Sequence, residues 1–393
     1  MSESFSRSES PEPVLLITGE YPPMSGGVGA YTAELAAALA ARGRPVAVLT
    51  SVAAQDAVQD GPVTVYPTVA RWDWRVWGQA RRLAQEIGAG WVHVQYQAAA
   101  YAMHPAINFA PGGWRRAGLR VAWTYHDLLV PYLFPKAGNR VRRWVTDRPA
   151  AVCDLTIVTN EGDRRHLASS ARRLACIPIG SNIHARPVGS VERAARRAQR
   201  GIGQDDLLVG YFGFLNRSKG GLVLVDALAK VAQSRPDVHL LMIGEQVGAS
   251  DTTNYAYLQQ VRAAIARYGL TPRVTWTGHL PAAEVSADLA ACDVLLMPYL
   301  DGASLRRGTL MAGLAHGCAM VTTQPHAPIA ELVEGRDLLY VPSDDAQAAA
   351  AAVLRLAADP PLAATLRVNA RAAAAVFSWE GIAAAHEQYY DAV

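Results

Sequence analysis

Short runs of apolar residues recur along this chain, and helix-length spacers separate many of them. In the first half, strand-like runs occupy residues 14–18, 45–50, 63–67, 91–96, 120–127, 155–160 and 175–183, with helical spacing at 32–42 and 75–87. An all-apolar run such as VLLIT at 14–18 is typical of a strand buried on both faces of a parallel sheet. The alternation therefore predicts βαβ units and a doubly wound sheet.

A second series of the same kind begins at residue 207. Its strand-like runs lie at 207–215, 238–243, 274–277, 294–297, 319–323 and 338–341, and its helical spacers at 221–234, 255–268, 281–291 and 329–334. A chain of 393 residues is also too long for one ordinary core. We therefore expect an α/β protein made of two Rossmann-like domains.

These patterns set the expected domain boundaries. Residues 1–13 are polar and lack the apolar core of a signal peptide, which predicts a disordered leader. We expect an N-terminal domain over 14–186, a connector with one exposed helix over 187–206, a C-terminal domain over 207–376, and a closing amphipathic helix over 377–393. No apolar run approaches the roughly 18 residues that cross a bilayer. A cytoplasmic location is therefore expected.

Composition argues against several kinds of site. The four cysteines form no C-x-x-C pair and the ten histidines show no metal-binding spacing, so no metal site is expected. The net charge is only +3, and no nucleic-acid partner is expected. Residues 136–200 nevertheless carry fourteen Lys or Arg against five Asp or Glu, and Trp72, Trp74, Trp77 and Trp144 stand among nearby arginines. This pattern predicts an anionic acceptor or weak peripheral membrane contact, with solvated helix faces as the alternative.

The loop after the apolar run at 294–297 carries two consecutive arginines, Arg306 and Arg307. A tightly packed helix follows and ends at Gly317, a usual C-terminal stop. Free amide groups and the positive end of the helix dipole point into such a loop, and guanidinium groups add to them. The loop therefore predicts a site for a doubly charged phosphate ligand, unless both arginines are merely solvated surface charges.

Further candidates also follow strands. Gly26, Gly27 and Gly29 separate the first strand from the first helix, where backbone amides can approach an anion. Their spacing does not match G-x-G-x-x-G, and a structural turn is the alternative. Lys219 follows the strand at 207–215, a position from which an ammonium group can reach a phosphate. We expect these loops to meet in a cleft between the carboxyl ends of both sheets.

Several segments taken together resemble the retaining glycosyltransferases of family 4, also called glycosyltransferase group 1. They are EYPPMSGGVGAY, TYHD, IPIGSN, GYFGFLNRSKGG, VTWTGHL, ACDVLLMPYLDGAS and FSWEGIAAAHEQYY, and they span nearly the whole chain. The resemblance implies a GT-B fold with a ligand cleft between the domains. It also implies a donor site in the C-terminal domain, an acceptor site in the N-terminal domain, and a final helix that crosses back to the first domain.

The resemblance implies roles for His126, Lys219 and the loop at Gly27 to Gly29, and the position and charge of the other candidate residues suggest theirs. His126, Lys219 and Arg306 are expected to be catalytic. The donor diphosphate and sugar are expected to contact Gly27, Val28, Gly29, Arg217, Lys219, Ser304, Leu305, Arg306, Arg307 and Thr309. The acceptor is expected to contact Tyr21, Gln97, His126 and Asp127.

The chain departs from the family pattern at two places. Phe214 stands where the family usually carries an arginine. Ser304 and Ala312 replace the two glutamates of the E-x7-E signature, which usually contact the donor sugar and the ribose. We therefore expect Ser304 and neighbouring amides to hold the sugar, and Arg306 or Arg307 to hold the phosphates.

The resemblance implies transfer of a hexosyl or N-acetylhexosaminyl group from a nucleotide-diphosphate sugar to an acceptor hydroxyl, with retention of configuration. A UDP-sugar is the first expectation and GDP-mannose the second. The acceptor could be a carbohydrate, a lipid-linked molecule or a small metabolite, and no cofactor is expected. The alternatives are a catalytically silent relative that binds a nucleotide or a partner, a nucleotide-sugar epimerase, and, with less support, a nicotinamide dehydrogenase.

Overall fold

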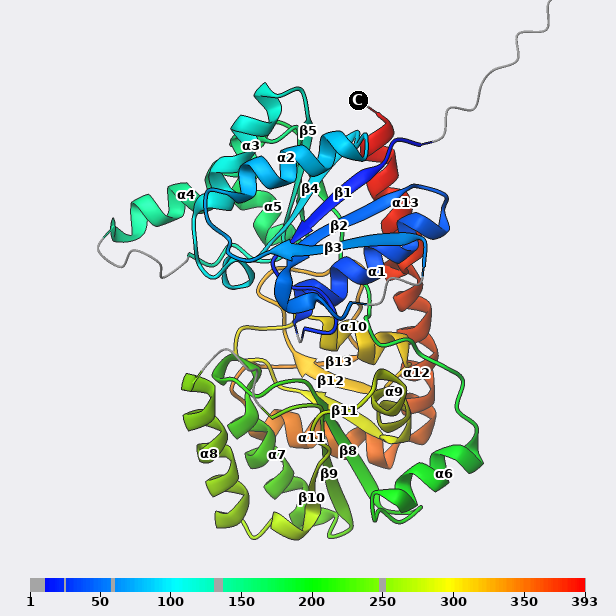
Figure 1. Ribbon diagram of the computed structural model, residues 1–393. Coiled ribbons are helices and arrows are strands. Elements are labelled where there is room, and N and C mark those ends of the chain that lie inside the picture. The colour runs from blue at the N-terminus through cyan, green and yellow to red at the C-terminus, as the bar shows by residue number, and fades with distance from the viewer. Residues whose placement is uncertain (1–10, 25, 58–60, 131–136, 247–251, 393) are drawn as a thin grey trace, which may run out of the picture. The chain divides into compact units, whose positions relative to one another are not determined.

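The computed structural model describes residues 11–24, 26–57, 61–130, 137–246 and 252–392 (Figure 1). The chain forms two compact units. The first unit comprises Met1–Ile179 and Trp379–Val393, and the second unit comprises Gly180–Ser378. The closing segment of the chain therefore belongs to the same unit as the beginning.

A seven-stranded parallel sheet forms the centre of the first unit, with strand order β3-β2-β1-β4-β5-β6-β7. The strands are β1 (Val14–Thr18), β2 (Val46–Ser51), β3 (Val63–Val69), β4 (Trp91–Tyr96), β5 (Arg120–Tyr125), β6 (Leu155–Val158) and β7 (Leu174–Cys176). The helices are α1 (Gly27–Ala41), α2 (Val76–Glu86), α3 (Ala106–Arg116), α4 (Gly138–Val152), α5 (Glu161–Leu167) and α13 (Trp379–Asp391), with 3-10 turns η1 (Val52–Ala54) and η2 (Ala98–Tyr101).

The two faces of this sheet explain the apolar run at 14–18. Leu15 and Ile17 pack in a core with side chains of α2, α3 and α4, whereas Val14 and Leu16 pack in a separate core with side chains of α1 and α13. Successive residues of a strand point to opposite faces, so a strand covered on both sides must be apolar at every position.

The second unit contains a six-stranded parallel sheet with strand order β10-β9-β8-β11-β12-β13. The strands are β8 (Leu207–Phe212), β9 (Val238–Ile243), β10 (Val274–Trp276), β11 (Val294–Met297), β12 (Met320–Thr323) and β13 (Leu339–Val341). The helices are α6 (Ser190–Gln199), α7 (Gly221–Ser234), α8 (Thr252–Arg267), α9 (Ala282–Ala291), α10 (Gly308–Ala315), α11 (Ala346–Ala358) and α12 (Pro360–Ala374), with turns η4 (Arg217–Lys219), η5 (Thr271–Arg273) and η6 (Ala375–Phe377). The predicted α/β class with two Rossmann-like sheets is confirmed.

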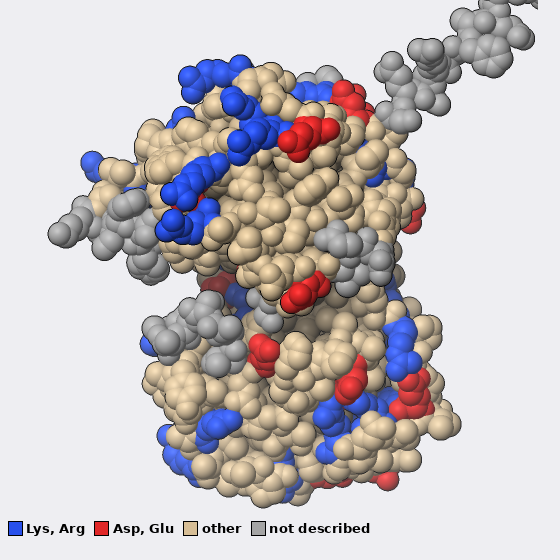
Figure 2. Space-filling view, viewed as in Figure 1, with Lys and Arg blue, Asp and Glu red and all other residues tan. Residues whose placement is uncertain are grey.

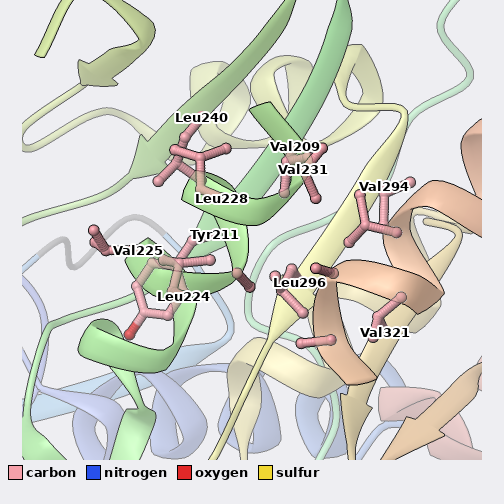
Figure 3. Close-up of a cluster of buried hydrophobic side chains, with 14 of the residues drawn as sticks. Val209, Tyr211, Leu224, Val225, Leu228, Val231, Leu240, Val294, Leu296 and Val321 are labelled. Carbon is pink, nitrogen blue, oxygen red and sulfur yellow. The ribbon is translucent and has the colours of Figure 1, made fainter. Parts of the chain in front are cut away.

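Apolar packing on one face of the second sheet holds the strands that carry the candidate phosphate loops. Figure 3 shows Val209 of β8 and Leu296 of β11 in the same cluster as Leu228 of α7. Each of these side chains is at most 2% exposed. Full burial of such a side chain contributes about 1.5–3 kcal/mol, so β8, β11 and α7 form a stable base for the loops at their ends.

Helix α13 packs against α1 in the first unit. Its final turn is tied down by polar contacts as well: the Trp91 indole nitrogen donates to the carbonyl of Tyr390 at 3.1 Å, and Arg44 binds Asp391 at 2.6 Å. Arg42 binds Glu387 at 2.6 Å. The predicted return of the chain to its first domain is therefore observed. Helix α13 contacts α1, β4 and the segment between α1 and β2.

The expectation of an exposed connector helix over 187–206 is wrong, because α6 packs on the second unit. Arg196 and Arg200 both bind the fully buried Asp288 of α9, each at 2.6 Å. Arg197 is buried and binds Asp293 at 3.1 Å. Long arginine side chains cover apolar surface and reach carboxylates that lie far away in the sequence. An Arg-rich helix such as α6 can therefore pack on a domain although it has few apolar residues.

The expected helix over 329–334 is also wrong. This stretch contains one turn at residues 330–331, Gly335 has a left-handed φ of 72°, and Glu334 pairs with Leu338 in an isolated bridge. The buried Asp337 carboxylate accepts a hydrogen bond from the Val333 amide at 2.8 Å. This local side-chain bond offers the backbone an alternative to a helix.

Two further expectations concerned the leader at the start of the chain and membrane-spanning helices. Residues 1–10 of the expected leader lie outside the described residues. Over the described ranges, no single helix is long and apolar enough to cross a bilayer, although Ala346–Ala358 together with Pro360–Asp391 passes that test as a pair bent by 102°.

The buried His386 of α13 makes stability depend on pH. Burial lowers the pKa of His386 from 6.5 to about 4, so the unfolded chain takes up a proton before the folded one. The contribution of neutral His386 to the free energy of unfolding is complete above the pKa of the unfolded state, 6.5. It is lost as the pH falls from that value toward the folded-state pKa of about 4. At pH 5 this histidine alone should cost about 2 kcal/mol of unfolding free energy. Burial also lowers the pKa values of His93 and His126, which should steepen the wild-type dependence.

Denaturant unfolding at a series of pH values from 7 to 5 measures this loss. His386→Phe should reduce the loss at pH 5 by about 2 kcal/mol relative to the wild type. Equal slopes for the two proteins would contradict the assignment.

Candidate functional site

The loop that follows β8 turns tightly before α7. Gly220 has a left-handed φ of 71°, and a Cβ there would lie 1.8 Å from the carbonyl oxygen of Pro298, so only glycine fits. The Asn216 side chain accepts hydrogen bonds from the Lys219 amide at 3.1 Å and from the Ser218 hydroxyl at 2.9 Å. These contacts hold Lys219 at the end of β8, where it meets the segment that follows β11.

Lys219 carries a positive charge that lacks a protein counterion. Among the described residues its Nζ has no hydrogen bond or ion pair, and its nearest ring is Phe214, 5.7 Å away. Burial lowers the pKa of Lys219, the neighbouring charge of Arg307 adds to this effect, and Asp301 opposes it, so that the pKa is about 8. At neutral pH most molecules therefore carry the charged ammonium group in a place that favours its neutral form.

Arg307 lies beside Lys219 and is held from two sides. One of its terminal nitrogens pairs with Asp301, and the guanidinium lies 4.1 Å from the ring centroid of Tyr299. The Tyr299 hydroxyl in turn lies 2.8 Å from the Thr309 hydroxyl. The Nε of Arg307 is buried and has no hydrogen-bond partner within the described chain. The guanidinium is therefore fixed in direction but not fully used by the protein.

The N-terminus of α10 adds to this positive charge. Arg307 is the N-cap residue, its side chain makes no cap hydrogen bond, and the first turn contains no acidic residue. Gly213 marks where the two loops meet, since a Cβ there would lie 2.8 Å from the Thr309 methyl and 3.3 Å from the Lys219 Nζ. Lys219, Arg307 and a helix N-terminus thus converge around the single carboxylate of Asp301, an arrangement that binds anions.

The other predicted donor residues lie around this centre. Arg306 and Arg217 are exposed, and Ser304 and Leu305 are half-buried. The Arg306 amide donates to the Ser304 hydroxyl at 3.5 Å, but no contact of the Arg306 guanidinium with Lys219 occurs among the described residues. Ala312 is fully buried in α10, so a carboxylate at this position would be an unpaired buried charge.

The expected role of the glycine loop in the first unit needs correction. The amides of Val28 and Gly29 donate to the Glu20 carboxylate at 3.1 and 3.2 Å, so they are not open to a phosphate. Burial raises the pKa of Glu20, while these two hydrogen bonds oppose the shift. A Cβ at Gly26 would lie 2.1 Å from the Glu20 carboxyl carbon. The glycines therefore make room for a carboxylate from the same chain at the N-terminus of α1.

His126 lies just after β5, at the carboxyl end of the first sheet. Its Nε2 lies 3.0 Å from the Gln95 side-chain oxygen, and its ring packs edge-on against Tyr31 with centroids 4.6 Å apart. Burial lowers the pKa of His126 to about 3, with a smaller contribution from His386. The imidazole is therefore neutral at physiological pH, and it can exchange hydrogen bonds but not carry charge.

The remaining predicted acceptor residues surround His126 or shape its loop. Asp127 accepts from the Gln97 amide nitrogen at 3.0 Å and from the Leu129 amide at 3.1 Å, which orients the loop. Tyr21 is buried in the core that contains α1. Sequence reasoning missed Glu20, Tyr299 and Asp301. No motif pointed to them, because each acts through a side-chain contact within its own loop that no residue pattern marks.

No group of three or more His, Cys, Asp or Glu side chains is placed to hold a metal ion in the ranges that the structure describes.

Both halves of the chain match models of glycosyltransferase families. Residues 206–359 match the family model described as glycosyl transferases group 1, and residues 25–184 match the model described as glycosyltransferase family 4.

Three curated relatives illustrate the match. The 2-deoxystreptamine glucosyltransferase of Streptomyces kanamyceticus is 29% identical over 159 residues, covering 40% of this chain and 39% of that protein. The D-inositol 3-phosphate glycosyltransferase of Corynebacterium urealyticum is 28% identical, covering 61% and 54%. A GDP-mannose-dependent alpha-(1-6)-phosphatidylinositol monomannoside mannosyltransferase of Mycolicibacterium smegmatis is 27% identical, covering 65% and 66%. The chain spans about half the length of the curated relatives it matches.

Solved structures share the fold. Sucrose-phosphate synthase from Thermosynechococcus elongatus gives a TM-score of 0.75 at 24% identity, covering 97% of this chain and 98% of that one. Anabaena HepE in complex with UDP and glucose gives 0.77 at 18% identity, covering 97% and 100%. With both sheets and both sequence halves in agreement, the chain belongs to the glycosyltransferase group 1 family, family 4, and has the GT-B fold.

Proposed function

We propose that this protein transfers a hexosyl or N-acetylhexosaminyl group from a nucleotide-diphosphate sugar to an acceptor hydroxyl with retention of configuration. The observation that carries the proposal is the incompletely balanced positive charge of Lys219 and Arg307 at the start of α10. A pyrophosphate group supplies the negative charge that this place lacks. The family to which the chain belongs supplies the reaction class.

The proposed mechanism is electrostatic. The bond between the anomeric carbon and the diphosphate oxygen breaks while the acceptor oxygen forms a bond to the same carbon from the same face. Negative charge develops on the departing diphosphate, which then takes the proton of the acceptor hydroxyl. Cations held in advance next to that charge lower the barrier, typically by a few kcal/mol each. Lys219 and Arg307 fill this role, and Arg306, which is more exposed, contributes less.

Ser304, Leu305 and Thr309 belong to the proposed donor site, together with Arg217 and the exposed Arg306 at its rim. Ser304 and nearby amides hold the sugar, since a hydroxyl can both donate to and accept from a sugar hydroxyl. His126, Gln97 and Asp127 form the acceptor side, with Tyr21 behind them. No metal or cofactor takes part in this proposal.

UDP-sugars are the first donors to test, and GDP-mannose is the second. A solved structural neighbour holds UDP and glucose, and a relative is named for GDP-mannose. Acceptors based on 2-deoxystreptamine, inositol phosphate or a phosphatidylinositol mannoside come first, because relatives are named for them. Other carbohydrates, lipid-linked molecules and small metabolites remain in the proposed class.

A catalytically silent relative is the second candidate. It is favoured by the fully buried Ala312, which offers no carboxylate to a ribose. Such a protein would bind a nucleoside diphosphate yet release none from any sugar donor. A screen that measures both binding and release of the diphosphate separates the two functions.

Removing the cations should weaken diphosphate binding without unfolding the protein. Lys219→Met and Arg307→Ala should each raise the Kd for UDP about 10- to 100-fold, since hydrogen bonds between charged groups contribute about 1.5–3 kcal/mol. Arg306→Ala should change it less than threefold and serves as the matched control. Isothermal titration measures the Kd, and thermal unfolding without ligand checks the fold. Equal effects of the Arg306 and Arg307 changes would contradict the assigned roles.

Diphosphate binding should also depend on pH through Lys219. Because the pKa of Lys219 in the free protein is about 8, the group is charged below that value and loses its charge above it. Affinity for UDP should be constant from pH 7 to 7.5 and should fall above about pH 8. Lys219→Arg keeps its charge and should remove this fall, and a wild-type fall that persists in this variant would show that another group titrates.

We also propose that one surface of the first unit makes weak contact with an anionic membrane. Trp74 and Trp144 are 51% and 57% exposed, and both pack against Phe109 of α3 at 5.9 Å between centroids. Arg148 lies over the same Phe109 ring, and Arg140 is exposed on α4. Figure 2 shows Lys and Arg gathered over the part of this unit that carries α2, α3 and α4. Exposed tryptophans among arginines fit an anionic lipid surface.

Vesicle co-sedimentation tests this surface. Wild-type protein should bind phosphatidylglycerol vesicles more than phosphatidylcholine vesicles, and the double variant Trp74→Ser, Trp144→Ser should lose most of that binding. The matched control is Tyr255→Ser with Tyr268→Ser, which removes two exposed aromatic rings from the second unit. Equal binding by both double variants would contradict the proposal.

A further inference from the structure

A chain of hydrogen bonds inside the first unit connects the C-terminal helix with His126. The Tyr390 hydroxyl of α13 lies 2.6 Å from Nδ1 of His93. The other ring nitrogen of His93, Nε2, lies 3.3 Å from the Gln95 amide nitrogen. The Gln95 oxygen lies 3.0 Å from Nε2 of His126. Tyr390, His93 and Gln95 are all buried, so water does not compete for these bonds.

The direction of the hydrogen bonds fixes where the protons sit. A side-chain amide nitrogen only donates, so Nε2 of His93 accepts from Gln95, and the His93 proton is on Nδ1, facing Tyr390. The Thr124 hydroxyl lies 2.7 Å from the same Nε2 and can donate to it. A side-chain amide oxygen only accepts, so Nε2 of His126 carries its proton toward Gln95. The lone pair of His126 is therefore on Nδ1.

Nδ1 of His126 is the free end of this chain. It has no hydrogen-bond partner among the described residues, and the His126 side chain is only half-buried. The imidazole stays neutral because burial lowers its pKa to about 3. Because the proton of the neutral ring is on Nε2 and bonded to Gln95, Nδ1 can only accept a hydrogen bond, for example from a hydroxyl group.

Helix α13 supports the chain at both of its ends. The main chain of Tyr390 is held by Trp91, and the Arg44 guanidinium lies 5.5 Å from the Tyr390 ring centroid. At the beginning of the same helix, the Trp379 ring packs against Tyr31, with centroids 5.1 Å apart. Tyr31 packs in turn against His126. Docking of α13 thus sets both the ring position and the proton position of His126.

We propose that Tyr390, His93 and Gln95 are positioning residues that hold His126 as the neutral Nε2–H tautomer, so that Nδ1 accepts a hydrogen bond from a substrate hydroxyl. This inference rests on the proposed sugar transfer only for the identity of that hydroxyl as one on the donor sugar or the acceptor. Under this proposal His126 orients the hydroxyl and neither gives nor takes a proton. The C-terminal helix is then part of the substrate site rather than a clasp that only stabilises the unit.

The competing explanation is that the chain merely satisfies buried polar groups. In that case, changes in the chain would alter stability without changing the tautomer of His126. Two substitutions separate these explanations. Tyr390→Phe removes the acceptor of the His93 proton, and Gln95→Glu replaces the amide by a carboxylate that accepts at both ends.

Nitrogen-15 NMR of histidine-labelled protein reads the tautomers directly, with His93 and His126 signals assigned by single substitutions. In the wild type, His126 should be the Nε2–H form and His93 the Nδ1–H form from pH 6 to 8. Tyr390→Phe should produce a tautomer mixture at both histidines. Tyr389→Phe, which removes a hydroxyl outside the chain on the same helix, should leave both unchanged.

Gln95→Glu supplies a second readout. A carboxylate beside Nε2 of His126 should raise the pKa of this histidine into the range that NMR titration measures. Tyr31 of α1, His93 of β4, His386 of α13 and the neighbouring Asp127 are the other titratable groups around the ring, and the substitution leaves them in place.

Two results would overturn the proposal. An Nδ1–H tautomer of His126 in the wild type would do so, because it corresponds to the reversed amide of Gln95. A Tyr390→Phe spectrum identical to the wild type would also do so. None of these readouts needs an active enzyme, whereas loss of UDP binding in Lys219→Met reports on the proposed function. The two ideas can therefore fail separately.

Discussion

Two cations that lie side by side, one of them paired with a carboxylate, set the character of the second unit. Lys219 lies in the turn after β8, Arg307 caps α10, and Asp301 pairs with Arg307. The loops can approach each other this closely because Gly213 and Gly220 lack a Cβ. A buried ammonium next to a guanidinium is costly for the free protein, and the lowered pKa of Lys219 expresses that cost. A dianion at this place converts the repulsion into binding energy.

The first unit has a different arrangement at the N-terminus of its first helix. The N-terminus of α1 receives the Glu20 carboxylate of the same chain, so the helix dipole is already neutralised there. The first sheet instead carries the neutral His126 at its carboxyl end. Its Nε2 proton is bonded to Gln95, and the lone pair on Nδ1 is free to accept a hydrogen bond. The first unit therefore provides hydrogen-bonding geometry, and the second unit provides charge. This division agrees with a reaction in which one substrate carries a diphosphate and the other carries hydroxyl groups.

Periodicity was enough to predict both sheets, because strands buried on two faces leave short all-apolar runs separated by helix-length spacers. The position of Lys219 after a strand was equally readable. The side-chain contacts were not readable. The pairing of α6 arginines with Asp288, the plug formed by Glu20, and the contact of Arg307 with Tyr299 all join residues whose sequence neighbours give no sign of a partner. The same limit explains why the two adjacent arginines could not be told apart: only the fold shows that Arg307 is held beside Lys219 and that Arg306 is exposed.

Proton uptake on binding tests the central claim most directly, since it reports on Lys219 itself. At pH 8 the ammonium group of the free protein is about half charged, and a bound diphosphate should restore its full charge. Calorimetric titration with UDP in buffers of different ionisation enthalpy should therefore show uptake of about half a proton by the wild type. Lys219→Arg should bind UDP with no uptake. Binding without proton uptake by the wild type, or equal uptake by both proteins, would contradict the account.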